Sequence, residues 1–292
     1  MNEILRPDPT VQSSAVVKPI SILFGGDVMF DRYIRTVTKQ KGQGFVLRDV
    51  AELLMQNDMV VVNLEGPITE QSSVSETSLE GEAKNYVFTF APDSVQQLQQ
   101  SHIGIVNIGN NHILNFGTDG VQSTKKFLTA GGVEFFGSPL PHDERILMKR
   151  IRDTSIALVN YNQFVTDGRE RALQDIVTAR ERGADVIVLY AHWGVEYKPV
   201  TDSVRDVAHQ FVEAGVDLII GSHPHVVQEK EVYQGKTIYY SLGNMVFDQY
   251  FRPETTQGLL VRATLDPRAH DFSLQEIPIL LKNTGQTILT EE

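Results

Sequence analysis

Short runs of apolar, largely β-branched residues recur along the chain, and each is followed by a carboxylate, an amide or an imidazole. Such runs predict buried strands, because parallel strands covered on both faces are almost continuously hydrophobic. In the clearest case, the run 216–221 is followed by His223 and His225. Residues two apart in an extended segment point to the same side, so both imidazoles can face one point. Taken alone, this pair indicates either a metal site or two loop histidines without a ligand.

The repetition of this pattern favours the metal site. The runs lead into a set of polar residues: Asp27, Asn63, Glu65, Asn111, His112, His192, His223, His225 and Asn244. In α/β proteins ligands bind at the carboxyl ends of strands, so we expect these side chains to meet at one edge of the sheets. The 292 residues include no cysteine. Oxygen and imidazole donors without thiolates suit zinc, manganese, iron, magnesium or nickel.

The rest of the pattern predicts two mixed sheets packed face to face, with helices outside. Helices are expected at about 169–182 and 203–214, each followed directly by a strand, which gives βα alternation. Hairpins are expected at 144–161 and 231–242. A single parallel sheet flanked by helices would not use so many strands in hairpins. The expected fold class is therefore α/β with two mixed sheets.

Two further predictions concern the surroundings of the strand ends. Gly25 and Gly26 predict a tight turn before Asp27, since glycine adopts backbone angles that other residues avoid. Residues 69–85 are rich in Ser, Thr and Glu and lack periodicity, so we expect a long surface loop that could act as a lid. A strand is expected directly after this loop, at 85–92.

Composition limits the domain organisation and the partners. We expect a flexible leader at 1–19, native or trimmed, and one domain over 20–292, a size that single α/β domains reach. The leader lacks the basic start and apolar stretch of a signal peptide. The net charge of -11 argues against a nucleic-acid-binding protein. No stretch reaches the ~18 apolar residues of a membrane helix, so no transmembrane segment is expected.

Six motifs occur in order over residues 21–250: GGDVMFDR, NLEGPI, GNNHILNFGTDG, AHWGVEY, GSHPHVVQ and SLGNMVFD. Together they resemble the motifs of the CapA family, which is linked to poly-γ-glutamate capsule synthesis and is similar to the calcineurin-like metallophosphoesterases. The resemblance implies a metallophosphatase-like, four-layer αββα sandwich. It also implies a centre of two divalent ions at one sheet edge, with manganese, zinc, iron or magnesium as candidates.

The resemblance assigns roles to individual residues. The metal ligands would be Asp27, Glu65, Asn111, His192, His223 and His225. Glu65 stands near the bridging position of the phosphoesterases, with Asn63 beside it. Asn244 could orient a ligand histidine from behind, or only turn the chain.

Two residues are expected to act on the substrate. The resemblance implies that His112 is not a ligand but contacts the scissile group, as an acid or hydrogen-bond donor. A structural histidine bonded to a backbone carbonyl is the alternative. Arg32 could hold a phosphate or carboxylate in a bidentate fork, or pair with a carboxylate of the protein itself. Met29 stands where phosphoesterases have histidine, so the first metal would bind weakly, use Asn63 or water instead, or be absent.

Two functions of different classes are consistent with these residues. One is a metal-dependent hydrolase-like enzyme acting on a phosphoester or on an intermediate of an anionic polymer. The other is a non-catalytic, metal-binding accessory subunit of a membrane poly-γ-glutamate synthase. The adjacent Asn111 and His112 favour the first, and Met29 favours the second. The resemblance places the protein at the cell surface, on the outer face of the membrane, with a cytoplasmic location as the alternative.

Overall fold

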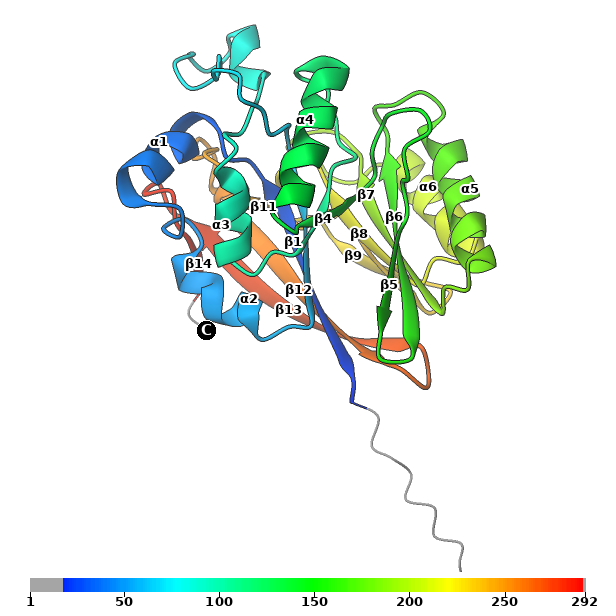
Figure 1. Cartoon of the computed structure of the whole chain (residues 1–292). Coiled ribbons are helices and arrows are strands. Elements are labelled where there is room, and N and C mark those ends of the chain that lie inside the picture. Colours follow the sequence, from blue (N-terminus) through cyan, green and yellow to red (C-terminus); the bar gives the residue numbers. More distant parts are fainter. Residues whose placement is uncertain (1–17, 291–292) are drawn as a thin grey trace, which may run out of the picture.

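Two mixed β-sheets pack face to face, and helices cover both outer surfaces, as Figure 1 shows. The structure is a computed structural model that describes residues 18–290. Residues 1–17 of the expected leader (1–19) lie outside the described residues. The four-layer αββα arrangement expected from the sequence is confirmed.

Within residues 18–290 the first sheet has eight strands in the order β14-β13-β12-β1-β2-β3-β4, with β11 pairing with β1. Strands β1 to β4 are parallel, and β12 to β14 add an antiparallel half. The strand bounds are β1 (Ile20–Val28), β2 (Met59–Leu64), β3 (Ile105–Asn107), β4 (Glu134–Phe136), β11 (Asn244–Val246), β12 (Gln257–Asp266), β13 (Asp271–Leu281) and β14 (Thr287–Leu289).

Over the same residues the second sheet has six strands in the order β5-β6-β7-β8-β10-β9. Its centre is parallel, and the two expected hairpins, β5/β6 and β9/β10, form its edges. The strand bounds are β5 (Leu147–Ile151), β6 (Thr154–Asn162), β7 (Val186–His192), β8 (Leu218–Ser222), β9 (Lys230–Tyr233) and β10 (Lys236–Tyr239).

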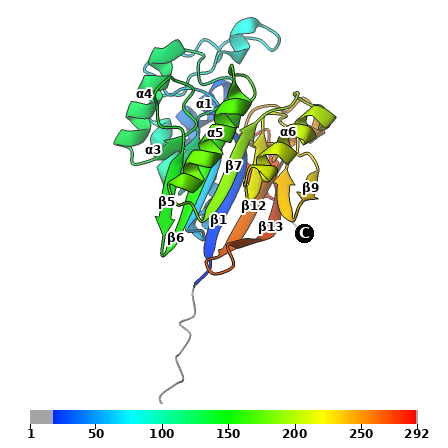
Figure 2. The ribbon, with the colours of Figure 1, turned by 90° about the vertical axis from the view of Figure 1, so that its right-hand side faces the viewer.

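Three hydrophobic layers hold the sandwich together. The middle layer lies between the sheets and includes Phe24, Val61, Val188 and Ile220, all fully buried. One outer layer lies under α1 (Arg32–Lys41), α2 (Ala51–Met55), α3 (Ser94–Gln100) and α4 (Gly117–Ala130). The other lies under α5 (Gly168–Glu181) and α6 (Asp202–Glu213), which Figure 2 shows side by side in front of the second sheet. Short 3-10 helices are η1 (Arg48–Val50), η2 (Ala83–Tyr86) and η3 (Pro253–Thr256).

The expected strand at 85–92 is wrong. The structure has η2 followed by extended chain that makes only an isolated bridge, Ile68 to Phe90. Side chains take the place of a neighbouring strand here: the Thr89 N–H donates to Asp31 Oδ2 (2.9 Å) and the Phe88 N–H donates to Asn115 Oδ1 (2.8 Å). An alternating sequence cannot reveal that its backbone partners are side chains from elsewhere in the chain.

The expected turn at Gly25 and Gly26 is also wrong, because β1 continues through both residues. Instead, the two glycines allow neighbouring segments to lie close to β1. A Cβ added to Gly26 would lie 1.8 Å from the carbonyl oxygen of Gly243. The Asp27 N–H donates to that same oxygen (3.0 Å), so the glycine lets the start of β11 lie against the end of β1. This contact fixes the strand end that carries Asp27.

Candidate metal centre

The strand ends of both sheets deliver polar side chains to one place. In the first sheet Asp27 of β1 lies in register with Asn63 of β2 on one side and with Asn244 of β11 on the other. In the second sheet His192 closes β7, and His223 follows β8 directly. All five residues are buried. The sequence prediction that these residues meet at one edge agrees with their positions.

Asp27, Glu65 and His225 form the centre of the cluster. One ligand-type atom from each lies within 4.8 Å of the others. His225 Nδ1 is 3.4 Å from Asp27 Oδ2, and His225 Nε2 is 3.5 Å from Glu65 Oε1. The exposed fraction is 0% for both acids and 2% for the histidine. Two buried acids at this spacing repel each other unless a proton or a cation lies between them.

The surroundings of Asn244 determine which nitrogen of His225 carries the hydrogen. Asn244 Nδ2 donates to backbone oxygens of Thr255 (3.0 Å) and His225 (3.4 Å) and to Gln249 Oε1 (3.1 Å). Its Oδ1 therefore faces His225 Nδ1 at 2.9 Å and accepts the Nδ1–H. The Nε2 lone pair is then left facing Glu65, which is the arrangement of a ligand histidine held from behind.

His192 is held in a similar way. The Ser222 hydroxyl donates to the Ala191 carbonyl (3.0 Å), so it accepts from His192 Nδ1 (3.0 Å). His192 Nε2 then presents a lone pair 2.9 Å from Asn111 Oδ1. Two acceptors this close have no hydrogen to share. The distance is near the ~3 Å expected between neighbouring ligands that each bind one cation at about 2.1 Å.

His223 lies beside this pair. Its ring centroid is 4.8 Å from that of His192, and its N–H donates to Asp27 Oδ2 (3.1 Å). Its φ of +98° and the φ of +58° at His225 lie in the left-handed region that side chains disfavour. Strained backbone of this kind persists where the surrounding structure enforces it, as at binding sites.

The electrostatics of the cluster differ from residue to residue. Burial and the negative charge of Asp27 raise the pKa of Glu65 well above its usual value. Burial also acts to raise the pKa of Asp27, but the hydrogen bonds from His225 and Asn63 oppose it, and the pKa of Asp27 is lowered. Burial lowers the pKa of His192 well below 6.5 and that of His223 to about 3, so both rings are neutral at pH 7. Neutral imidazoles are the form that binds metals.

The donor set fits divalent cations. Two buried atoms that face the cluster, Glu65 Oε1 and His223 Nδ1, have no hydrogen-bond partner. Buried polar atoms are normally paired, so two orphans in one cluster indicate a missing partner that accepts electron pairs. Carboxylate, amide and imidazole groups together are suitable ligands for zinc, manganese, iron or magnesium.

His112 lies at the edge of the cluster. Its Nε2 is 3.9 Å from Glu65 Oε1, its Nδ1 is 3.1 Å from Asn115 Oδ1, and its ring packs on Phe88 with centroids 4.4 Å apart. Burial lowers the pKa of His112 to about 4, with the hydrogen bond to Asn115 opposing the shift. The side chain is 11% exposed, so it borders the centre and also reaches solvent.

Three other expectations can be compared with the structure. Arg32 contacts Asp248 through Nη2 and donates to Asn85 Oδ1 (3.0 Å) through Nη1, so it follows the alternative of pairing with a protein carboxylate. Met29 is buried in the outer core, and its sulfur accepts the Asp31 N–H (2.9 Å). It offers no ligand to the cluster.

Asn63 does not present an oxygen to the cluster. Its Oδ1 accepts from Asn107 (3.0 Å) and Asn110 (3.1 Å), and its Nδ2 donates to Asp27 Oδ1 (2.8 Å). The hypothesis that Asn63 replaces the missing imidazole as a ligand therefore finds no support in the orientation of its amide. Asn63 positions Asp27 instead.

Sequence reasoning missed several residues around the cluster. Asn107 and Asn110 orient Asn63, Ser222 orients His192, and the exposed ring of Phe164 packs on His223 with centroids 4.4 Å apart. Asn110 and Ser222 carried a signal, since they belong to the GNNH and GSHPH motifs. The others are neutral groups whose roles depend on contacts between distant segments.

A cleft of about 760 Å³ lies near the centre: none of the candidate ligands lines it, but the ring of its lining residue Tyr197 is 6.0 Å from the His225 ring. Loop residues such as Ser75 and Glu80 form one wall, and Arg32 and Tyr197 line it as well. The loop 69–85, at the top of Figure 1, thus borders the approach to the centre. Across residues 18–290 no helix has the length and apolar character needed to span a bilayer.

Comparison with known proteins identifies relatives linked to capsule synthesis. A family model described as "Bacterial capsule synthesis protein PGA_cap" matches residues 21–249. The chain is 28% identical over 247 residues to "PGA biosynthesis protein CapA" of Bacillus subtilis (strain 168), covering 79% of this chain and 64% of that protein. It is 26% identical over 258 residues to a "Probable polyglutamine synthesis accessory protein" of Mycobacterium tuberculosis (strain ATCC 25618 / H37Rv), covering 76% and 66%. The chain thus spans less than two thirds of the length of these relatives.

A solved structure with the same fold is NAD nucleotidase of Haemophilus influenzae. It superposes with a TM-score of 0.51 at 11% identity, covering 94% of this chain and 54% of that one. At this identity the likeness concerns the metallophosphatase-like fold alone.

Proposed function

Because this chain belongs to the bacterial capsule synthesis PGA_cap family, we propose that it acts as a metal-dependent hydrolase in the synthesis of poly-γ-glutamate. The single observation that carries the proposal is the buried cluster at the strand ends, with Glu65 Oε1 and His223 Nδ1 unpartnered. The proposed substrate is a phosphoester or an intermediate of an anionic polymer.

The position of each residue in the cluster assigns it to one side of the proposed metal centre. Asp27, Glu65 and His225 would hold one side of a centre of two divalent ions, and His192 with Asn111 would hold the other. Bound divalent ions activate water and neutralise charge on an attacked phosphoryl oxygen.

Two further side chains act around this centre. Asn244 keeps the Nε2 lone pair of His225 directed at the centre. His112 borders the centre and is partly exposed. Because the ring is neutral at pH 7 and its Nδ1–H is directed at Asn115 Oδ1, its Nε2 can accept a proton, and the protonated ring would then donate to the leaving group while it stays off the metal.

Purified protein tests the proposal directly. Elemental analysis without chelator should find at least one transition metal per chain. Chelated protein should gain turnover of an aryl phosphate or a diphosphate ester when manganese, zinc or magnesium is added. Absence of bound metal after incubation with all three ions would refute the proposal.

The second candidate is a metal-binding accessory subunit of a membrane synthase, outside the cell. The position of Met29 supports it, because that residue is buried in the outer core and leaves one metal with fewer ligands. The printed name of the Mycobacterium tuberculosis relative describes an accessory protein. Metal binding without turnover on a broad ester panel, combined with loss of polymer in cells on His112→Asn, would favour this candidate.

A further inference from the structure

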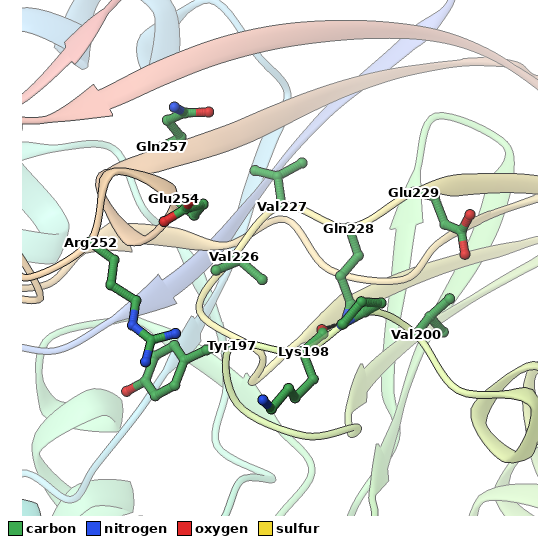
Figure 3. Close-up of a pocket in the computed structure, with 11 residues that line it drawn as sticks. Tyr197, Lys198, Val200, Val226, Val227, Gln228, Glu229, Arg252, Glu254 and Gln257 are labelled. Atoms are coloured by element: carbon green, nitrogen blue, oxygen red, sulfur yellow. Dashed lines mark hydrogen bonds between the residues drawn. The ribbon is translucent and has the colours of Figure 1, made fainter.

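A second cleft, of about 540 Å³, lies beside the first and shares Tyr197 and Arg252 with it. Figure 3 shows the Arg252 side chain extended towards the Tyr197 ring, with Lys198 next along the chain. The two clefts therefore meet at this pair of side chains. A molecule longer than one ester group could occupy both.

The ring of Tyr197, called the Tyr197 platform below, is held in place by contacts of its backbone and its hydroxyl. The residue's φ of +60° is in the left-handed region, its N–H donates to the Pro224 carbonyl (2.9 Å), and its hydroxyl accepts from Gln249 Nε2 (2.9 Å). Gln249 in turn accepts from Asn244, which holds His225. The Tyr197 ring is 6.0 Å from the His225 ring, so the platform begins at the edge of the candidate metal centre.

The guanidinium group of Arg252 packs against the Tyr197 ring. Its guanidinium carbon lies 5.2 Å from the Tyr197 ring centroid and 5.9 Å from that of Phe251. Among the described residues it has no hydrogen bond or ion pair through its side chain, whereas Arg32 in the neighbouring cleft is occupied by Asp248. Stacking on aromatic faces leaves the edge of the guanidinium open for a carboxylate or phosphate. It also limits the freedom that binding must remove.

Lys198 adds a second cation to the same cleft. Its carbonyl accepts from Gln228 Nε2 (2.7 Å), which fixes the backbone from which the side chain projects. Of the acids that line the cleft, Glu229 is engaged by Arg205, and Glu254 makes no ion pair with Arg252 or Lys198. In a chain of net charge -11, an arginine and a lysine that have no ion-pair partner within residues 18–290 form a local site for negative charge in this cleft.

We propose that Arg252 and Lys198 form a subsite for an anionic group of the substrate, separate from the metal centre and reached along the Tyr197 platform. The expected ligand is a chain molecule with repeated carboxylates. One carboxylate would bind Arg252 while another part of the same molecule lies beside the metal centre. The inference depends on the proposed function for the nature of the substrate, but the binding step needs no turnover.

Calorimetric titration with a γ-linked tetraglutamate tests this subsite, with tetraglutamine as the uncharged control. Arg252→Gln should weaken tetraglutamate binding about 10-fold and reduce its salt dependence, because a charge-assisted bond is lost. Lys198→Gln should weaken it less, since lysine offers a single point charge. Arg150→Gln, on the distant edge strand β5, is the matched control and should bind as the unmodified protein does.

Metal content should be unchanged in Arg252→Gln, which separates this subsite from the metal centre. Equal tetraglutamate affinity in Arg252→Gln and unmodified protein would overturn the inference. So would equal loss in Arg150→Gln, or equal binding of tetraglutamine. Failure of metal binding in the unmodified protein would instead refute the proposed function.

Discussion

His112 and His223 lie within one cluster but are held in different ways. His223 Nδ1 has no partner, whereas His112 Nδ1 is engaged by Asn115 and its ring is fixed on Phe88. A side chain held by the protein can act on a substrate, and an unpartnered buried nitrogen is available to a metal. The two histidines should therefore respond differently to substitution.

His112→Asn should leave metal content intact and lower kcat by about 10²–10⁴, the usual effect of losing a general acid–base group. His223→Ala should lower metal content and turnover together. Elemental analysis and steady-state kinetics on the same preparations measure both quantities. If His112→Asn loses metal as readily as His223→Ala, then His112 is a ligand and its proposed role is wrong.

The neutral state of the largely buried His112 also predicts a pH dependence of stability. Its folded pKa is about 4, below the ~6.5 of an unfolded histidine, so the unfolded chain binds more protons between these values. The stability is complete above about pH 6.5 and is lost as the pH falls towards 4. At pH 5 the loss from this residue should be about 2 kcal/mol.

Urea unfolding of metal-free protein at pH 7 and pH 5 measures this dependence. His112→Asn should reduce the difference between the two pH values by that amount. The exposed His142→Asn is the matched control. The same difference in both variants would show that His112 does not titrate as proposed.

At the scale of elements, the sequence predicted the strands and hairpins of the sandwich because burial on both faces leaves a continuous apolar pattern. It predicted where Asp27, His192 and His223 lie, since strand ends fix them. It failed where backbone groups bond to side chains, as at Thr89, and where glycines serve close approach rather than turns, as at Gly26. Those contacts join distant segments, and local pattern carries no record of them.

The loop 69–85 is attached to the sandwich through Asp31. This buried carboxylate accepts from Ser75 Oγ (2.8 Å), from the Thr89 N–H (2.9 Å) and from Arg35 Nε (2.8 Å). The first contact holds the loop itself, and the second holds the chain that follows it, beside the approach to the metal centre. The third comes from Arg35 of α1 and ties this helix to the same carboxylate.

Ser75→Ala should release the loop without unfolding the domain. Loss of one hydrogen bond to a charged group is worth about 1.5–3 kcal/mol, so protease cleavage within 69–85 should become at least about 10-fold faster. The melting temperature should change little. Ser72→Ala, at an exposed position of the same loop, is the matched control; equal cleavage of both variants would contradict the anchoring role of Asp31.

For the whole molecule, bound metal should raise thermal stability. The net charge is -11, and two of the acids lie buried beside each other at the cluster. A ligand that binds only the folded state adds about 2.7 kcal/mol at a hundredfold excess over its Kd. Chelator should lower Tm, and manganese or zinc should restore it. An unchanged Tm after verified removal of the metal would contradict this expectation.

The candidate ligands come from both sheets: Asp27 lies in β1 and Glu65 follows β2 in the first, and His192 ends β7 and His223 follows β8 in the second. Between the sheets most contacts are side-chain packing, which is non-directional and yields gradually, with a few directed bonds such as that from the Tyr190 hydroxyl to the Gly25 carbonyl. An ion bound by both would act as a cross-link between the layers. The sheets could then slide or separate only after the ion had left, so the rate of ion release would set the upper limit on how fast the loaded protein opens.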